Sequence, residues 1–258
     1  MKIEQFDEIM KEKGWVLLEA VVPEELVLRM ADELQSAYLN CRSLQERNGI
    51  STGTEYTVHH LIGQGESFLE YLEAQYIHPY LTHYFSGAYI LNSFGGAINS
   101  RNSTNYAHRI HRDVRTFTHN FPLLINTLVM LDNFTSENGA TLVLSGSHHA
   151  EDKPDEKFFD DHAEQVIGPA GSILIFDSNV WHAAARNQTN TPRRSVTPMY
   201  SRPFIKQQFD YPRALGNELG EMLEEEMRQL IGYNSRVPAS LNEWYQPPEK
   251  RMYKPGQG

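Results

Sequence analysis

The spacing of hydrophobic and polar positions changes near residue 88. Before that point apolar residues recur at helical intervals, which predicts a short helix over 3–13 closed by Gly14 and another over 67–85. Between them lies a helix whose buried stripe repeats every four residues: Leu26, Met30, Leu34 and Tyr38. The polar stretch 40–54 is predicted to be a loop near a site.

From residue 88 onward, short apolar runs separated by Gly, Pro, Asn and Asp predict strands. These runs cover 88–93, 97–100, 123–131, 140–144, 165–167, 172–176 and 195–200. Helices first and strands later favour an α+β, mainly β, fold class with helices packed on a double-stranded β-helix core. We expect a single domain over 1–258, with a core of about 10–205 and a C-terminal part, 206–258, that holds one helix over 217–230 and an irregular tail.

Composition narrows the possible partners. The chain has 258 residues and a formal net charge of -10, which disfavours binding to nucleic acid. Its single cysteine, Cys41, allows no intrachain disulfide, and no apolar run reaches the roughly 18 residues of a membrane helix. The first residues lack the apolar region of a signal peptide. We therefore expect a cytoplasmic protein, a monomer or homodimer, that contacts no membrane.

The main candidate for chemistry is the tripeptide His111-Arg112-Asp113. On an extended strand, residues two apart point to the same face, so His111 and Asp113 are able to face one ion. His182, which follows the predicted strand 172–176 and a polar turn, supplies a third ligand. Two histidines and a carboxylate are typical of non-haem Fe(II) oxygenases. The alternatives are a partly buried His111 bonded to Asp113, and a core histidine at 182.

Eleven residues after His182 comes Arg193. A guanidinium near an iron site suits the distal carboxylate of 2-oxoglutarate, because the two groups pair in a bidentate way. On a strand, Arg193 and Arg194 point to opposite faces, so one of them at most faces the site. The alternative is that Arg193 is a surface residue.

Several segments resemble the phytanoyl-CoA dioxygenase (PhyH-like) family of Fe(II)/2-oxoglutarate oxygenases over about residues 10–205. They are 14–17, 22–26, the H-x-D tripeptide, 131–141, the Ser-Gly-Ser-His run at 145–148, and 182–193. Ser145 stands where the family usually has proline, and Ala184 stands where some relatives have a serine that contacts the co-substrate. The order and spacing of these segments make the joint match specific.

The resemblance implies a double-stranded β-helix of the jelly-roll or cupin type, with iron on His111, Asp113 and His182. It also implies 2-oxoglutarate held by Arg193, and O2 as the oxidant. Further co-substrate contacts are expected at Asn99, Thr141 and Asn126, although each is equally well read as an ordinary polar strand residue. The implied reaction releases succinate and CO2 and oxidises, by default hydroxylates, an unactivated C–H bond. Asp113 disfavours halogenation, while cyclisation, desaturation or epimerisation use the same ligands.

The sequence says least about the substrate. Arg109 and Arg115 share the strand parity of His111 and Asp113, so they face the substrate or form salt bridges. Other predicted pocket walls are Phe117, Trp181, Tyr200 and the loop 40–54. The resemblance to the family suggests a small-molecule substrate, such as a secondary-metabolite or sugar-containing intermediate. Two rival functions remain: a non-catalytic β-barrel binding module, against which Arg193 argues, and a metal-dependent hydrolase or isomerase with the same three ligands.

Overall fold

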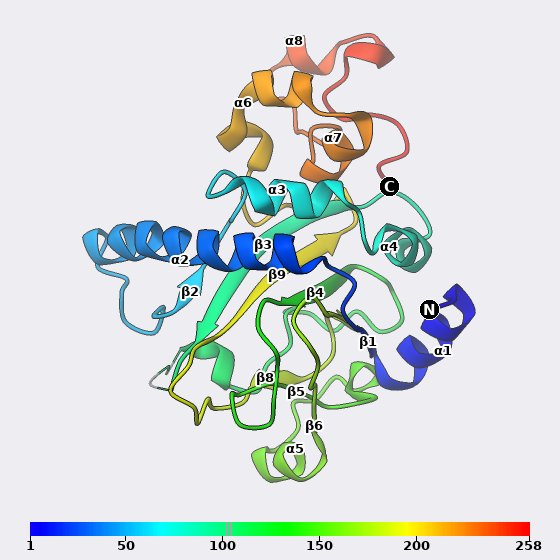
Figure 1. Cartoon of the computed structure of the whole chain (residues 1–258). Helices are drawn as coiled ribbons and strands as arrows, with labels where there is room; N and C mark the ends of the chain where they lie inside the picture. Colours follow the sequence, from blue (N-terminus) through cyan, green and yellow to red (C-terminus); the bar gives the residue numbers. More distant parts are fainter. Residues whose placement is uncertain (102, 104) are drawn as a thin grey trace.

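The computed structural model describes residues 1–101, 103 and 105–258 (Figure 1). Within them, two antiparallel sheets form the centre of the molecule. The larger sheet has the strand order β1-β7-β4-β9-β3-β2, and the smaller has the order β6-β5-β8. The strand bounds are β1 (Trp15–Leu18), β2 (Thr57–Val58), β3 (Ile90–Asn99), β4 (Leu124–Met130), β5 (Thr141–Val143), β6 (Glu164–Gln165), β7 (Ile173–Asp177), β8 (His182–Ala184) and β9 (Arg193–Ser201).

Helices cover one face of the larger sheet and extend beyond its ends (Figure 1). The helix bounds are α1 (Ile3–Lys13), α2 (Glu24–Arg47), α3 (Glu66–Glu73), α4 (His78–Phe85), α5 (Glu156–His162), α6 (Tyr211–Met222), α7 (Glu225–Ile231) and α8 (Leu241–Trp244). Of these, α5 lies beside the smaller sheet. Helical residues outnumber strand residues, at 35% against 20%. The predicted α+β class, with a double-stranded β-helix core flanked by helices, is confirmed.

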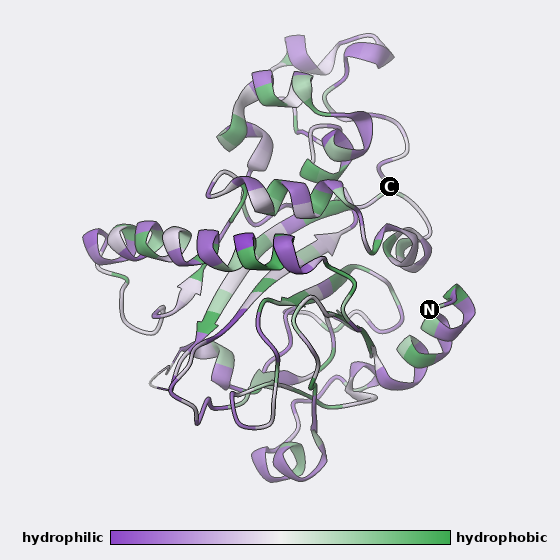
Figure 2. Cartoon of the chain, viewed as in Figure 1, coloured by the Kyte–Doolittle hydropathy of each residue, from purple (hydrophilic) through white to green (hydrophobic). Residues whose placement is uncertain are grey.

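The main hydrophobic core lies between these helices and the larger sheet. From the helical side it takes the predicted stripe of α2, including Met30 and Leu34, which are fully buried. From the sheet it takes alternate residues of β9, Val196 and Tyr200, together with their counterparts on β3, β4 and β7. Figure 2 shows the hydrophobic positions of α2 and α3 turned toward the sheet.

The other face of the larger sheet borders a cavity. Since side chains alternate along a strand, the residues of β9 between those in the core point into this cavity: Arg193, Ser195, Thr197 and Met199. The register of β3 on β9 pairs Gly95 with Thr197 and Ala97 with Ser195. Small residues therefore lie beside the inward side chains of β9 and leave room above the sheet.

Several predicted elements differ from the structure. The stretch 40–54 is not one loop, because α2 continues to Arg47 and its buried face includes Gln45. The predicted helix 67–85 is two helices, and so is 217–230, where α6 ends at Met222 and α7 begins at Glu225. The two strands predicted at 88–93 and 97–100 are one strand, β3. The sequence pattern also missed the short strands β2 and β8.

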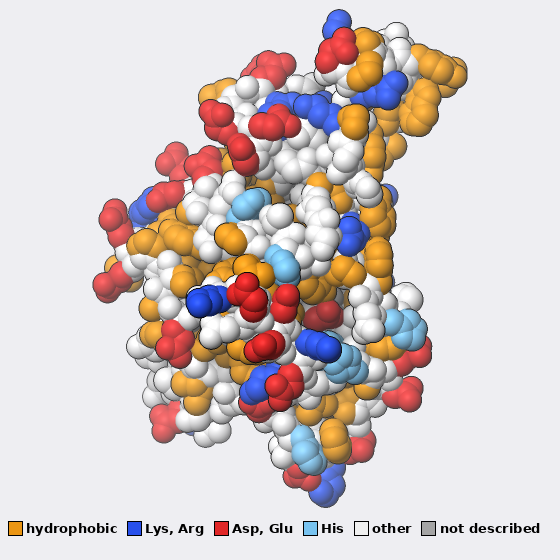
Figure 3. Space-filling view, turned by 90° about the vertical axis from the view of Figure 1, so that its right-hand side faces the viewer, with side chains coloured by type: hydrophobic (Ala, Val, Ile, Leu, Met, Phe, Trp, Pro, Cys, Tyr) orange, Lys and Arg blue, Asp and Glu red, His pale blue; other side chains and the backbone are white. Residues whose placement is uncertain are grey.

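The surface carries charges of both signs, and hydrophobic side chains gather at the end of the molecule that holds α8 (Figure 3). Leu241, Trp244 and Tyr245 are exposed there. Among the described residues, no helix combines the length and apolar character needed to cross a membrane.

Candidate metal and co-substrate site

His111, Asp113 and His182 meet at one side of the cavity. Each offers one ligand atom, and the three atoms lie within 4.8 Å of one another. The Nε2 atoms of His111 and His182 are each 3.6 Å from a different carboxylate oxygen of Asp113. Two imidazoles and one carboxylate at this separation form a donor set that suits Fe(II) and leaves other coordination positions open.

The backbone brings the two histidines together. His111 and His182 form an antiparallel bridge in which the N–H of each donates to the carbonyl of the other, at 3.0 and 2.9 Å. Apart from this bridge, the segment around His111 is irregular, so His111 and Asp113 do not share the face of a regular strand. Asp113 is held differently, because its N–H donates to the carbonyl of Ser178 in the turn before His182.

Hydrogen bonds also set which ring nitrogen of each histidine faces the site. Nδ1 of His111 lies 2.7 Å from the carbonyl of Arg109, and Nδ1 of His182 lies 3.0 Å from the carbonyl of Val180. A carbonyl only accepts hydrogen bonds, so Nδ1 carries the proton and Nε2 keeps its lone pair for a metal. Burial and the neighbouring His111 lower the pKa of His182 to about 4, which keeps its ring neutral at pH 7.

Asn126 on β4 supports the carboxylate ligand. Its side-chain amide donates a hydrogen bond to Asp113, and its amide oxygen accepts one from the hydroxyl of Ser178 at 3.5 Å. Asn126 also borders the cavity. The structure thus places Asn126 against a metal ligand, a position that the sequence alone did not indicate.

Arg193 is a buried cation that forms no ion pair with any residue that the structure describes. Only 2% of the residue is exposed, and its Nε and Nη1 atoms form no hydrogen bond with any residue that the structure describes. Its guanidinium carbon lies 4.2 Å from the centre of the Phe134 ring, and burial lowers its pKa to about 10. Because an unpaired buried charge is costly, this guanidinium is arranged for an anionic ligand.

The neighbouring Arg194 faces the other way and is paired. Its Nε and Nη2 atoms donate to the two carboxylate oxygens of Asp132, at 3.0 and 2.7 Å. Of these two adjacent arginines, Arg193 lines the cavity and Arg194 is tied to the surface beside β4, as the alternation along a strand requires.

The other expected co-substrate contacts divide into two groups. Thr141 on β5 lines the cavity, as Asn126 does, and both stay predicted co-substrate contacts. Asn99 does not border the cavity: its amide donates to the carbonyls of Gly139 and Ala185, at 3.2 and 3.0 Å, and ties two loops together. Ala184 borders the cavity but has no polar side chain.

The expected substrate contacts lie outside the cavity. Arg109 and Arg115 are exposed, because the segment that carries them is not a regular strand and parity does not hold along it. Phe117 and Trp181 pack instead on Arg112, whose guanidinium carbon is 5.4 and 5.1 Å from their ring centres. Tyr200 faces the helical core, and residues 40–54 do not line the cavity.

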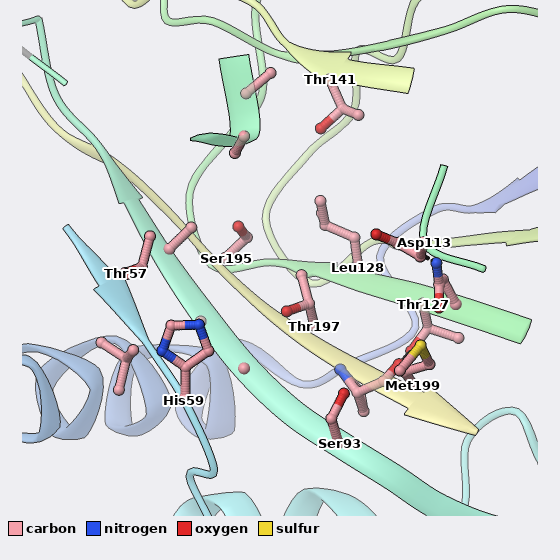
Figure 4. Close-up of a pocket in the computed structure, with 18 of the residues that line it drawn as sticks. Thr57, His59, Ser93, Asp113, Thr127, Leu128, Thr141, Ser195, Thr197 and Met199 are labelled. Atoms are coloured by element: carbon pink, nitrogen blue, oxygen red, sulfur yellow. Dashed lines mark hydrogen bonds between the residues drawn. The ribbon is translucent and has the colours of Figure 1, made fainter. Parts of the chain in front are cut away.

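The cavity has a volume of about 240 Å³, and its walls include residues that the sequence analysis missed (Figure 4). They are Ser93, Ser195, Thr197, His59, His60 and Tyr106. Two of them had a readable signal, because Ser195 and Thr197 share the strand parity of Arg193. The histidine pair comes from a loop and Tyr106 begins a short 3-10 helix over 106–108, and nothing in their local pattern pointed to the site.

Comparison with known proteins identifies the family of this chain. A family model described as phytanoyl-CoA dioxygenase (PhyH) matches residues 10–195. The chain belongs to the phytanoyl-CoA dioxygenase family. The match includes the H-x-D tripeptide, the distal histidine and Arg193, and confirms the resemblance seen in the sequence.

Individual relatives agree with this assignment. An uncharacterised protein of Mycobacterium tuberculosis (strain H37Rv) is 41% identical over 155 residues, which cover 59% of this chain and 56% of that protein. The iron/alpha-ketoglutarate-dependent dioxygenase PenM of Penicillium thymicola is 30% identical over 160 residues, 55% of this chain and 47% of PenM. The chain thus spans about half the length of these curated relatives.

A solved structure shares the fold. The non-heme alpha-ketoglutarate-dependent epimerase SnoN from nogalamycin biosynthesis superposes with a TM-score of 0.59 at 16% identity, covering 77% of this chain and 81% of SnoN. The phytanoyl-CoA dioxygenase family implies Fe(II), 2-oxoglutarate and O2. The three ligand atoms and the unpaired guanidinium of Arg193 fit the iron and the 2-oxoglutarate.

Proposed function

We propose that this protein is an Fe(II)/2-oxoglutarate-dependent dioxygenase that oxidises an unactivated C–H bond of a small molecule. The observation that supports this most strongly is the pairing, in one cavity, of a 2-His-1-carboxylate cluster with a buried unpaired guanidinium. A purely structural metal site has no use for that guanidinium, so the rival of a non-catalytic binding module has less support.

His111, Asp113 and His182 would hold the iron, and Arg193 would bind the distal carboxylate of 2-oxoglutarate. Bound together, the iron and 2-oxoglutarate supply a strong oxidant from O2 while 2-oxoglutarate is converted to succinate and CO2. The chain itself positions Asp113 through Asn126, directs Nε2 of both histidines toward the metal, and buries the charge of Arg193 away from water.

Hydroxylation is the reaction that we expect by default. Asp113 occupies the ligand position that must be vacated for a halide, so halogenation is disfavoured. Cyclisation, desaturation and epimerisation would use the same ligands, and the distinction depends on where the substrate places its C–H bond.

Turnover of 2-oxoglutarate tests the proposal. The protein with Fe(II), ascorbate and 2-oxoglutarate in air should release succinate slowly even without substrate. Asp113→Ala should abolish this release, while Arg115→Ala, on an exposed side chain outside the cavity, should leave it unchanged. Succinate release that persists in Asp113→Ala, or depends on zinc rather than iron, would favour another enzyme class.

A further inference from the structure

The cavity extends beyond the metal ligands along the inward face of β3 and β9. There its wall consists of Ser93, Ser195 and Thr197, with Gly95 and Ala97 between them. In Figure 4 these side chains line the space between Asp113 on one side and His59 on the other. Ser195 lies two residues from Arg193 on the same face of β9, whereas Thr197 and Ser93 lie farther along the sheet. That farther part of the cavity is available to a substrate.

The hydroxyl groups of this wall are free of protein partners. Within the described part of the chain, Ser93, Ser195 and Thr197 donate no side-chain hydrogen bond and accept none. Two other threonines of the cavity differ: Thr127 donates to the carbonyl of Pro198, and Thr57 donates to that of Thr54, each at 2.7 Å. Buried polar groups are normally hydrogen-bonded, so the three free hydroxyls are available to a ligand.

Beside this wall, where the chain leaves β2, lies a polar rim that includes His59 and His60. Nε2 of His59 lies 3.3 Å from the hydroxyl of Tyr106, and His60 stacks on Phe209 with ring centres 4.4 Å apart. The hydroxyl of Tyr211 further fixes His60, 3.3 Å from its Nδ1. Burial lowers the pKa of both histidines, for His60 to about 4, so both rings are neutral at pH 7.

The acidic and basic side chains that line the cavity already have proposed roles, with the metal or with 2-oxoglutarate. Among the described lining residues, the acidic side chain is that of Asp113, beside the two ligand histidines, and the guanidinium is that of Arg193. Beyond Ser195, which is next to Arg193, neither a phosphate nor a carboxylate of a substrate would find a cation beside Thr197 and Ser93 among the described lining residues. Burying an unpaired charge there would be costly, while a neutral hydroxylated group would find several donors and acceptors.

We propose that the hydroxyl wall of β3 and β9, with the rim formed by His59 and Tyr106, binds an uncharged, polyhydroxylated part of the substrate. This inference rests on the proposed function and names the substrate class of the same site. The cavity volume of about 240 Å³ lies below the roughly 300–1,000 Å³ usual for ligand pockets, so one end of the substrate enters while the rest remains outside.

Gly95 offers a steric test of this wall. A Cβ atom built there would lie 3.1 Å from the hydroxyl oxygen of Thr197 and 3.3 Å from the carbonyl oxygen of Val58. Gly95→Ala therefore crowds the hydroxyl wall and touches none of the iron or 2-oxoglutarate groups. Thr197→Val removes one hydroxyl at nearly constant shape.

The experiment is calorimetry without oxygen on protein loaded with Fe(II) and 2-oxoglutarate. Three probes are compared: methyl β-D-glucopyranoside, glucose 6-phosphate, and the apolar ring methoxycyclohexane. We expect the glucoside to bind at least about tenfold more tightly than the other two. Thr197→Val should weaken it by about fivefold, the value of one hydrogen bond, and Gly95→Ala by at least as much.

The matched control is Thr52→Val, which makes the same change on an exposed loop and should alter nothing. Both cavity variants should keep the wild-type affinity for 2-oxoglutarate, which shows that they fold and that the co-substrate site is intact. Tighter binding of either other probe, no binding of the glucoside, or equal binding to all variants would overturn the inference. If wild-type protein does not bind 2-oxoglutarate at all, the proposed function itself fails.

Discussion

His111 and His182 hold each other through their backbones, exchanging both hydrogen bonds of an antiparallel bridge at 3.0 and 2.9 Å. Their rings lie on the same side, with centres 4.2 Å apart. Two residues 71 positions apart in sequence are thus paired through their backbones, without use of the ring nitrogens that would bind a metal. We therefore expect the fold, rather than the metal, to organise the site.

Hydrogen exchange of the metal-free protein tests this organisation. The amides of His111 and His182 should exchange slowly, because each is bonded within the bridge. The amide of Thr116, which has no backbone partner among the described residues, should exchange fast and serves as the reference. Equal, fast exchange at all three amides before iron is added would show that the metal builds the site.

Arg112 is predicted to stabilise the site from outside. Its guanidinium packs on Phe117 and on Trp181, the residue before His182, and so links the segments that carry the ligands. Arg112→Ala should lower the free energy of unfolding by about 1–2 kcal/mol, since each cation–π contact contributes about 0.5–1 kcal/mol. We also expect a several-fold weaker affinity for Fe(II), measured by competition with a chelator.

The control for Arg112 is Arg115→Ala, which removes an exposed arginine three residues away. It should change neither unfolding nor metal affinity. If the two variants behave alike, the contacts of Arg112 do not support the metal site.

Replacing Arg193 should raise the stability of the protein and weaken its binding of 2-oxoglutarate. Arg193→Met removes a buried charge with no protein partner and should raise the free energy of unfolding of the ligand-free protein by about 1 kcal/mol or more. The same change should weaken 2-oxoglutarate binding by at least about tenfold, since one hydrogen bond to a charged group contributes about 1.5–3 kcal/mol. Denaturant unfolding and calorimetry measure the two effects.

The matched variant is Arg194→Met, which breaks the ion pair with Asp132 outside the cavity. It should lower stability and leave the affinity for 2-oxoglutarate nearly unchanged. Arg193→Met with unaltered 2-oxoglutarate affinity would refute the assignment of this guanidinium.

His60 gives a prediction for pH. Its pKa is lowered to about 4 in the folded protein by burial and by His59, against 6.5 for an ordinary histidine. Between these values the unfolded chain takes up a proton that the folded protein does not. The contribution of a neutral His60 to the free energy of unfolding is therefore fully present above about pH 6.5 and is lost as the pH falls toward 4. In His60→Asn, which tolerates the positive φ of 59° at this position, the melting temperature should fall less between pH 7 and 5.

Other histidines have lowered pKa values as well, so the variant keeps part of the pH dependence. The informative quantity is the difference between the slopes of wild type and His60→Asn. Parallel curves would mean that the ring of His60 is not buried as the structure has it.

The sequence predicted what depends on local pattern and on motifs. The buried stripe of α2 and the alternation of Arg193 and Arg194 on β9 were predictable because each follows the period of its element. The family membership was predictable because several segments match known motifs. The iron ligands were named from spacing, and the structure brings them together, although on a bridge rather than a strand.

What the sequence could not supply depends on contacts between distant segments. Asn126 lies on a predicted strand, but its hydrogen bond to Asp113 follows from how β4 faces the ligand segment. Arg109 and Arg115 do not share a face with His111, as a regular strand would require, because the chain is irregular there. His59 and Tyr106 meet only through the packing of a loop against a short 3-10 helix. That residues 1–258 form a single domain stays a prediction.

The most direct test of the account is to add Fe(II) and then 2-oxoglutarate to metal-free protein in the absence of oxygen. We predict the weak visible charge-transfer band of a chelated complex in wild-type protein, and its loss in His182→Ala. A folded wild-type protein that shows no band, or a His182→Ala variant that keeps it, would contradict the site.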